Sequence, residues 1–274
     1  MATPSQPALP EPIRGEEDTS DKMSLIEHLI ELRKRLLYSA VAIAIGFVIG
    51  FSVAKWVINF VAQPMVNALR QAHYPDKLIF TGPAEYVNLL IKVGFYLGLV
   101  IALPVILHQI WLFVAPGLYK HERKAVLSFI LSSVFLFLCG IAFAYFILLP
   151  FVLKFLITFQ GPQGPFQPLI SISEYFDLIL IVMVGLGAIF ELPVLIFVLS
   201  VFGIVTPQWL WKNLRYAILI ITVVAAIVTP TPDATTMLVF MAPMLALYFL
   251  GIGVSYMVFR KKRKDEIAEQ GAHQ

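Results

Sequence analysis

The sequence predicts an all-α integral membrane protein whose six transmembrane helices form a kinked, concave bundle with both termini in the cytoplasm. Of its 274 residues, 59% are hydrophobic and only 14% are charged, and the mean hydropathy is +0.84. Such a chain has more apolar surface than a water-soluble domain can bury. The apolar residues fall in long runs, and most Lys and Arg residues cluster between these runs. Lipid must therefore cover much of the surface.

Six apolar runs are candidate spans, because a helix needs about 20 apolar residues to cross the hydrocarbon core of a bilayer. We place the spans at 36–58, 86–113, 125–149, 175–202, 216–228 and 234–259. The fifth run is short, covering about 20 Å at helical rise against a core of about 30 Å. Two compatible interpretations stay open: neighbouring helices shield this span, or the bilayer is locally thinned around it.

The basic residues predict the orientation. Four clusters lie between the spans or flank them, at 33–35, 120–124, 212–215 and 260–264. All four fall on one side of the membrane, which the positive-inside rule assigns to the cytoplasm. The chain then divides into a disordered cytoplasmic tail (1–21), a six-span domain (22–259) and a basic cytoplasmic tail (260–274). The first tail has neither a signal-peptide nor a transit-peptide pattern, so we expect the inner membrane of a prokaryote.

Short helices are expected on both sides of the first span. Ser24 and Glu27 fit a capping box, which predicts an amphipathic helix leading into that span. The segment 63–71 resembles a second amphipathic helix on the outer side, entered through Pro64. Three later spans contain an internal proline, namely Pro104, Pro193 and Pro243. Each proline should kink its helix, which favours a curved bundle.

Enzyme signatures are absent from the sequence. It contains no nucleophile elbow, phosphate-binding loop or dinucleotide glycine fingerprint, and its five histidines and single Cys139 show no metal-ligand spacing. We therefore expect neither an enzyme nor a cofactor or metal. The basic run at 260–264 directly follows a span, and this position favours contact with anionic lipid over nucleic acid.

Three acidic residues have simple structural interpretations. Glu31 lies one turn before Arg35, which is the spacing of an ordinary helical ion pair. Glu122 is flanked by cations and resembles a solvated loop charge. Asp233 follows Pro232 and could cap the amino terminus of the sixth span. Position alone assigns no function to these three acids.

Glu191 differs because it lies within the fourth apolar run, where an ionised carboxylate costs about 3 kcal/mol at the bilayer centre. It should face the bundle interior or a water-filled cavity. Lys92 is its obvious counter-charge, so a structural Glu191–Lys92 pair and a proton-relay or substrate-contact role both stay open. The latter would suit a proton-coupled secondary transporter, a class that usually shows inverted repeats and more spans than this chain.

Four stretches of sequence together resemble one family. They are 28–35 before the first span, 104–107 and 109–123 around the first cytoplasmic loop, and 190–193 in the fourth span. These stretches closely resemble the TatC family, the receptor subunits of the twin-arginine protein translocase, and the resemblance extends over nearly the whole of 22–259. It implies six spans with both termini cytoplasmic, as the loop charges predict independently.

The resemblance also implies a binding site on the cytoplasmic face. Glu31 and Glu122 would bind the paired arginines of a folded substrate's signal peptide, with Arg33 supporting the site and Phe113 and Tyr119 shaping the loop. The chemistry is sensible, because a carboxylate can bind a guanidinium through two charge-assisted hydrogen bonds and binds lysine less well. These roles would replace the simple structural interpretations of both acids.

Other implied roles lie deeper in the membrane or outside it. Pro64 would place an outer cap, Glu191 would lie near the deeper path of the signal peptide, and Asp233 would be an acid of the outer turn before the last span. Met237 stands where the family often carries a glutamine that contacts a partner helix. The implied partners are single-span subunits of the TatA and TatB type, in a larger complex that contains several copies of the chain and is driven by the proton-motive force.

Overall fold

The computed structural model describes residues 17–114, 123–159, 169–229 and 233–272. Within these ranges the secondary structure is helical, apart from one isolated bridge between Ile79 and Ser171. The helical elements, in chain order, are α1 (Glu17–Gln71), α2 (Glu85–Val114), α3 (Arg123–Phe143), the π-helix η2 (Ala144–Leu148), α4 (Leu149–Phe159), α5 (Ile172–Phe190), α6 (Leu192–Val201), α7 (Pro207–Lys212), α8 (Leu214–Val228) and α9 (Ala234–Ala272).

Five helical stretches of the described chain are long and apolar enough to cross a membrane. They are Leu29–Gln71, Glu85–Phe113, Ile130–Ile157, Ile172–Val201 and Ala234–Arg260. The predicted short fifth span corresponds to α8, which is apolar but has only 15 residues. The protein is therefore a multi-pass membrane protein with five long apolar helices and a short one in the part that the structure describes.

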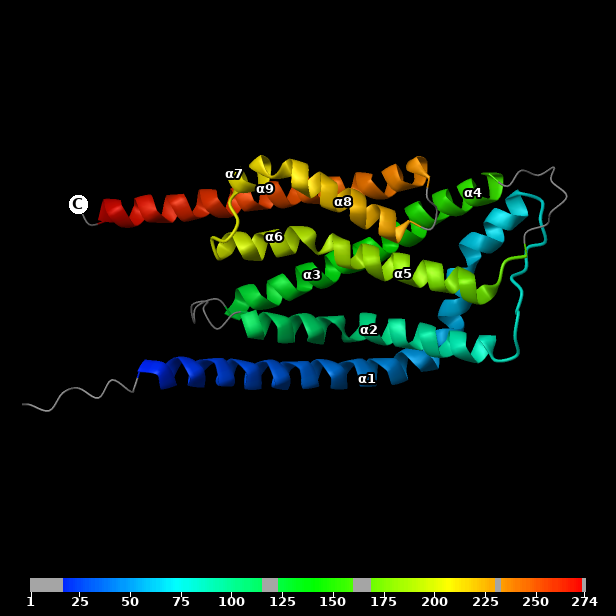
Figure 1. Ribbon diagram of the computed structural model, residues 1–274, viewed down its shortest axis with the longest axis horizontal. Helices are drawn as coiled ribbons and strands as arrows, with labels where there is room; N and C mark the ends of the chain where they lie inside the picture. Colours follow the sequence, from blue (N-terminus) through cyan, green and yellow to red (C-terminus); the bar gives the residue numbers. More distant parts are fainter. Residues whose placement is uncertain (1–16, 115–122, 160–168, 230–232, 273–274) are drawn as a thin grey trace, which may run out of the picture.

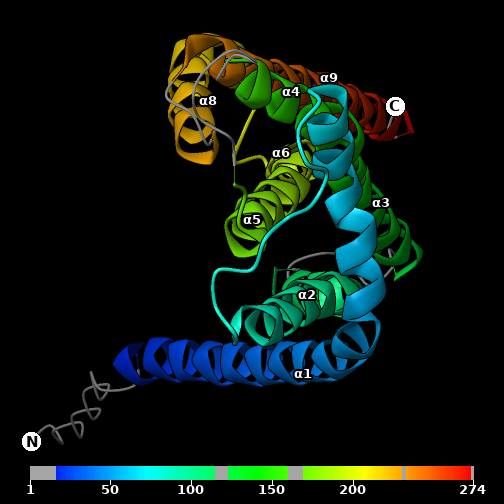
Figure 2. The ribbon, with the colours of Figure 1, turned by 90° about the vertical axis from the view of Figure 1, so that its right-hand side faces the viewer.

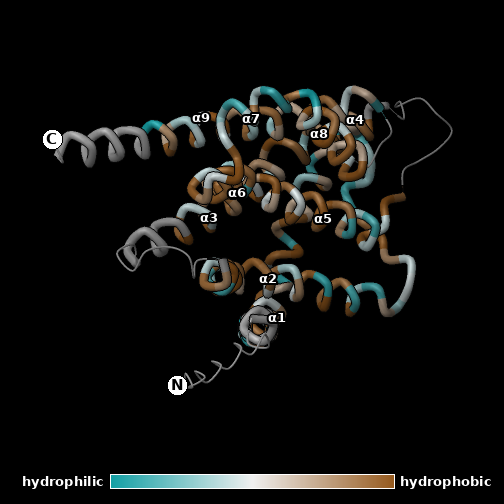
Figure 3. Tube along the Cα trace, turned by 60° about the vertical axis from the view of Figure 1, so that its left-hand side comes forward, coloured by the Kyte–Doolittle hydropathy of each residue, from teal (hydrophilic) through white to brown (hydrophobic). Residues whose placement is uncertain are grey.

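The helices run roughly parallel to one long axis. Figure 1 shows that α1 begins and α9 ends at one end of the bundle, here called the terminal end, while α2 and α5 begin at the opposite far end. Viewed from the far end, the elements follow a curved row from α1 and α2 through α3 and α5 to α9 (Figure 2). Hydrophobic residues dominate the helical parts of the trace, and hydrophilic ones gather toward helix ends and turns (Figure 3).

The first helix is longer than the sequence predicts. It begins at Glu17, inside the segment expected to be a disordered tail, and continues without a break to Gln71. The prediction that a capping box at Ser24 and Glu27 begins the helix is therefore wrong, because both residues lie inside α1. The acidic residues that precede them favour a helix amino terminus, since they interact well with its dipole. At the other end of the chain, α9 continues through the predicted basic tail as far as Ala272.

The outer part of α1 is not a separate helix. Pro64 lies inside α1, and the last turns of the helix swing away from its first part to cross the far end of the bundle (Figures 1 and 2). The bend gives this segment the position expected of an outer cap. The sequence therefore predicts its place but not its continuity with the first span.

The fourth span consists of two helices. α5 ends at Phe190, Glu191 forms a single turn residue, and α6 begins at Leu192 with Pro193 in its first turn. The predicted kink at Pro193 is thus a break in the helix. By contrast, Pro104 and Pro243 lie inside α2 and α9, which both continue through them.

Two hydrophobic cores hold the bundle together. One joins the outer part of α1 to α2, α4 and α5 around Phe176 and Leu153, which are fully buried. The other joins η2, α5, α6, α8 and α9 around Phe240 and Leu186. Because α5 contributes to both cores, it links the two halves of the curved row.

Glycines bring α1 and α2 into backbone contact. Each helix carries two glycines four residues apart, Gly46 and Gly50 on α1 and Gly94 and Gly98 on α2. A Cβ atom added to Gly50 would lie 2.6 Å from the Gly94 carbonyl oxygen, a distance too short for any side chain. This small-residue contact is a common way for membrane helices to pack, since lipid gives no hydrophobic drive for association.

Candidate functional site

A charged cluster joins α1 and α2 at the terminal end. Glu31 Oε1 accepts a hydrogen bond from Arg35 Nη2 at 3.0 Å, which is the ion pair that the sequence spacing predicts. Arg35 Nη1 also donates to Gln109 Oε1 of α2 at 3.3 Å. The Glu31 side chain is 35% exposed and that of Arg35 is 24% exposed. The Glu31 carboxylate is therefore held in place and still reachable from outside.

The other residues predicted for this site are only partly described. Arg33 is exposed on α1, and Phe113 is half-buried in the last turn of α2. Tyr119 and Glu122 lie in the segment 115–122, outside the described residues. α2 itself ends at Val114, at the terminal end of the bundle (Figure 1).

A half-buried glutamate lies where the fourth span breaks. Glu191 Oε1 is shielded from solvent, and Ser133 of α3, which is also buried, approaches the same carboxyl. Among the described residues, neither Glu191 Oε1 nor Ser133 Oγ has a hydrogen-bond partner. A buried polar atom without a hydrogen-bond partner is costly, and Ser133 is the polar side chain near this carboxyl in the described part of the chain.

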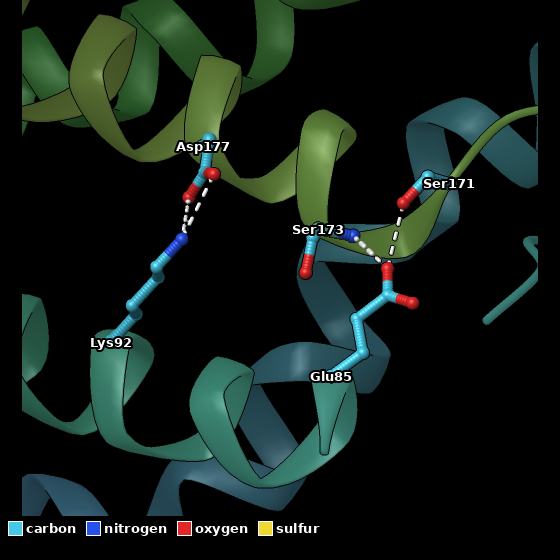
Figure 4. Close-up of polar contacts among 5 residues, drawn as sticks. All are labelled: Glu85, Lys92, Ser171, Ser173 and Asp177. Atoms are coloured by element: carbon cyan, nitrogen blue, oxygen red, sulfur yellow. Dashed lines mark hydrogen bonds and ion pairs between the residues drawn. The ribbon is translucent and has the colours of Figure 1, made fainter. Parts of the chain in front are cut away.

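The expected pairing of Lys92 with Glu191 is wrong. Lys92 Nζ instead donates to both carboxylate oxygens of Asp177 on α5, at 2.6 and 2.9 Å (Figure 4). The reason is depth along the bundle. Both α2 and α5 start at the far end, and Glu191 lies 14 residues beyond Asp177, which is about 20 Å at helical rise. Matching the positions of Lys92 and Asp177 within their spans could have found this pair from the sequence.

Glu85 is a buried acid that sequence reasoning missed. Its side chain is 8% exposed, and Oε1 accepts from the Ser171 hydroxyl at 2.7 Å and the Ser173 amide at 3.1 Å (Figure 4). Oε2 accepts from the Thr81 hydroxyl at 2.9 Å, the Thr81 amide and the Gly82 amide at 3.2 Å. Glu85 thus ties the start of α2 to the start of α5 at the far end.

Asp233 and Met237, the two residues predicted near the start of the last span, both lie in the described part of the chain. Asp233 Oδ1 accepts a hydrogen bond from the Thr236 amide at 2.7 Å, which confirms the predicted amino-terminal cap of α9. Met237 is half-buried and packs against the core of η2, α5, α6, α8 and α9. Within the described chain, no cluster of His, Cys, Asp and Glu could hold a metal ion.

Comparisons with known proteins agree on one assignment. The family model for the Sec-independent protein translocase protein TatC matches residues 27–243. The chain is 46% identical over 253 residues to TatC of Koribacter versatilis, covering 91% of this chain and 92% of that protein. It is 39% identical to TatC of Aquifex aeolicus, with 90% and 100% covered, and 37% identical to TatCy of Bacillus subtilis, with 91% and 95% covered.

A solved structure gives the same result for the fold. A crystal structure described as the twin-arginine translocase receptor TatC superposes with a TM-score of 0.74 at 38% identity, covering 85% of this chain and 99% of that one. The helical fold and these relatives define a membrane-embedded component of a protein transport system. The chain belongs to the TatC family of Sec-independent protein translocase proteins.

Proposed function

We propose that this protein is the receptor of a twin-arginine translocase, which binds twin-arginine signal peptides at the cytoplasmic face of the inner membrane. Folded substrates would then cross with the help of TatA- and TatB-type single-span subunits and the proton-motive force. The name of the structural relative, a twin-arginine translocase receptor, supports this function. The predicted basic clusters support an orientation with the terminal end in the cytoplasm.

The ion pair between Glu31 and Arg35 carries the proposal. The Arg35 guanidinium lies 3.0 Å from the Glu31 carboxylate in the first part of α1, the helix that begins at the terminal end (Figure 1), and a cytoplasmic peptide would arrive at this end in the proposed orientation. An arginine of the signal peptide can bind the Glu31 carboxylate, either by displacing Arg35 or while Arg35 stays bound. Arginine suits this contact better than lysine, because its planar guanidinium can offer two parallel hydrogen bonds.

Glu122 is proposed as the second carboxylate of the site. It follows the end of α2 by eight residues, and Arg35 already links α1 to α2 through Gln109. Two carboxylates on neighbouring segments would let the site distinguish paired arginines from a single one. Arg33, Phe113 and Tyr119 would surround them and orient the peptide.

Glu191 is proposed to receive a polar group from the deeper part of the peptide or from a partner helix. Its buried oxygen without a partner supports this role. A transporter that uses a Glu191–Lys92 pair has lost its basis, because Lys92 bonds to Asp177. The exposed side of α8, which includes Leu219, Ile220 and Val223, supports a short fifth span that is open to partner helices. Anionic lipid would contact the basic segment after α9.

Binding of a labelled twin-arginine signal peptide to the full chain in membranes tests the site. Glu31→Gln removes the charge but keeps the shape, and loss of one charge-assisted contact should weaken binding about 10- to 100-fold. Glu122→Gln should have a similar effect. A peptide with two lysines in place of the arginines should bind the unchanged protein weakly and should lose little further affinity in either variant.

Glu27→Gln is the matched control, since Glu27 is an exposed acid one turn before Glu31 on α1. It removes the same charge from the same end and should leave the affinity nearly unchanged. Equal affinity of the Glu31→Gln, Glu122→Gln and unchanged chains would disprove the site. Equal losses in all three variants would indicate a diffuse electrostatic attraction instead of a defined carboxylate pair.

A further inference from the structure

Pro64 leaves a backbone carbonyl without its helical partner. A proline inside a helix has no N–H to donate to the carbonyl four residues earlier, and its ring pushes that carbonyl aside. In α1 this carbonyl belongs to Phe60. An unpaired carbonyl at membrane depth is expensive, because lipid offers no hydrogen bond.

Tyr145 supplies the missing hydrogen bond. Its hydroxyl donates to the Phe60 carbonyl oxygen at 2.8 Å, and its ring stacks on that of Phe60 with centroids 4.7 Å apart. The Tyr145 side chain comes from the π-helix η2, far from α1 in sequence, and is 7% exposed. The Tyr145 hydroxyl thus replaces the hydrogen bond to the Phe60 carbonyl that a proline at residue 64 cannot make.

Tyr175 acts on the next carbonyl. Its hydroxyl donates to the Val61 carbonyl oxygen at 2.7 Å, and the residue is 2% exposed at the start of α5. Two buried tyrosines from two different elements therefore bind consecutive carbonyls beside one proline. Hydrophobic residues make up this core, and the two hydroxyls add directional contacts that apolar packing alone lacks.

The same stretch of α1 is fixed along one face. Ala54, Ile58, Val61, Met65 and Leu69 recur at helical spacing and are all buried in the core shared with α2, α4 and α5. On the opposite face, Trp56 is exposed. Packing therefore fixes this face, while the two hydroxyl contacts lie beside Pro64, where the helix lacks the hydrogen bond from residue 64 to the Phe60 carbonyl.

We infer that Tyr145 and Tyr175 are positioning residues that hold the outer part of α1 across the far end of the bundle. Tyr145 replaces the helical hydrogen bond that Pro64 removes, and Tyr175 adds a second hydrogen bond to the next carbonyl. This role concerns the far end and does not depend on the signal-peptide site. It predicts that the Tyr145 hydroxyl matters because residue 64 is a proline. Restoring an N–H at residue 64 should make that hydroxyl dispensable.

The test is a double-mutant cycle of Tyr145→Phe and Pro64→Ala in the full chain, measured by thermal unfolding in detergent. With Pro64 present, Tyr145→Phe leaves the Phe60 carbonyl unpaired and should lower Tm by about 3–6 °C. In the Pro64→Ala chain, the restored amide can bond to Phe60, and the same change should cost less than about half of that. Equal losses of Tm in both chains would overturn the inference.

A distance measurement separates positioning from simple stability. Spin labels on Asn67→Cys and Lys154→Cys, in a Cys139→Ala chain, report the outer part of α1 against α4, since both sites are exposed. Tyr145→Phe and Tyr175→Phe should each broaden the distance distribution below the unfolding temperature. An unchanged distribution in both variants would also overturn the inference.

Tyr248→Phe is the matched control. It removes another buried hydroxyl, which donates to the Leu210 carbonyl oxygen at 2.9 Å in the other core. It should lower Tm equally with Pro64 and with Pro64→Ala, and it should leave the label distances unchanged. If Tyr145→Phe folds only in the Pro64→Ala chain, that rescue supports the inference, and Tyr175→Phe then provides the distance readout.

Discussion

Lys92 Nζ lies 2.6 Å from Asp177 Oδ1, and this ion pair joins α2 to α5 near the far end of the bundle. The two side chains are 45% and 49% exposed, so water weakens the attraction and the pair contributes about 1 kcal/mol at most. We expect Lys92→Ala and Asp177→Ala each to lower the free energy of unfolding by about this amount. Chemical denaturation in detergent measures the change.

The exchanged chain Lys92→Asp with Asp177→Lys is the control for this pair. It keeps both charges and reverses their order, so it should recover much of the lost stability. If the exchanged chain is no more stable than the single variants, the pair contributes through packing and not through charge.

Glu85→Ala should destabilise the far end more strongly. It leaves the donors of Thr81, Gly82, Ser171 and Ser173 without their shared acceptor. The Ser171 hydroxyl belongs to a buried residue, where an unpaired donor costs about 1–3 kcal/mol, whereas the other donors belong to exposed or half-buried residues and lose less. We expect a loss of about 3 kcal/mol in the free energy of unfolding. Hydrogen exchange should also become faster at the Ser173 and Gly82 amides, while the amide of Thr236, capped by Asp233, stays protected.

The close contact between α1 and α2 predicts that a Gly→Ala substitution lowers the free energy of unfolding at Gly50 but not at Gly185. Gly50→Ala would place a methyl group 2.6 Å from the Gly94 carbonyl oxygen and should cost about 2 kcal/mol through overpacking. Gly185→Ala on α5 meets no atom within 4 Å and should be neutral or stabilising by up to about 1 kcal/mol, since alanine favours helix. Similar unfolding midpoints for the two variants would contradict the backbone contact.

A pH effect is expected at the turn after α1. Arg70 donates to Asp76 Oδ2 at 2.8 Å, and this hydrogen bond holds the pKa of the exposed Asp76 carboxyl below its usual range. Because the folded pKa is lowered, the contact stabilises the turn above the usual carboxyl range and is lost as the pH falls through the lowered pKa. A carbon-detected NMR titration should show this pKa moving upward in Arg70→Gln. If Asp76 has the same pKa in the unchanged and Arg70→Gln chains, the hydrogen bond from Arg70 is not the cause of the lowered pKa.

The sequence predicts the spans well because long apolar runs have one physical solution in a bilayer. The second span was expected at 86–113 and is found at Glu85–Val114, and the cap of α9 by Asp233 was predicted from local chemistry alone. These features depend on residues close together in the chain. The position of Pro64 in an outer segment follows from the same local reasoning.

Pairings between helices were harder to predict, because they depend on depth and rotation. A Lys92–Glu191 pair was one of the two interpretations open from the sequence, whereas Lys92 bonds to Asp177, which lies at a similar distance from the start of its own helix. The paired glycines of α1 and α2 carry the four-residue spacing that is typical of closely packed membrane helices. The contacts of Tyr145 and Tyr175 leave no local pattern, since backbone carbonyls have no identity in a sequence.

The glycine contact between α1 and α2 also bears on the order in which the chain assembles. The two helices are consecutive, and all the glycines of their contact have been synthesised once the chain has reached Gly98. During synthesis they can therefore close as a hairpin while the later helices have yet to leave the ribosome. The outer part of α1 depends on Tyr145 and Tyr175, so it reaches its final position only after the start of α5 has been made. The first part of α1 can thus pack early against α2, whereas its outer part reaches its final position only after the later helices have been made.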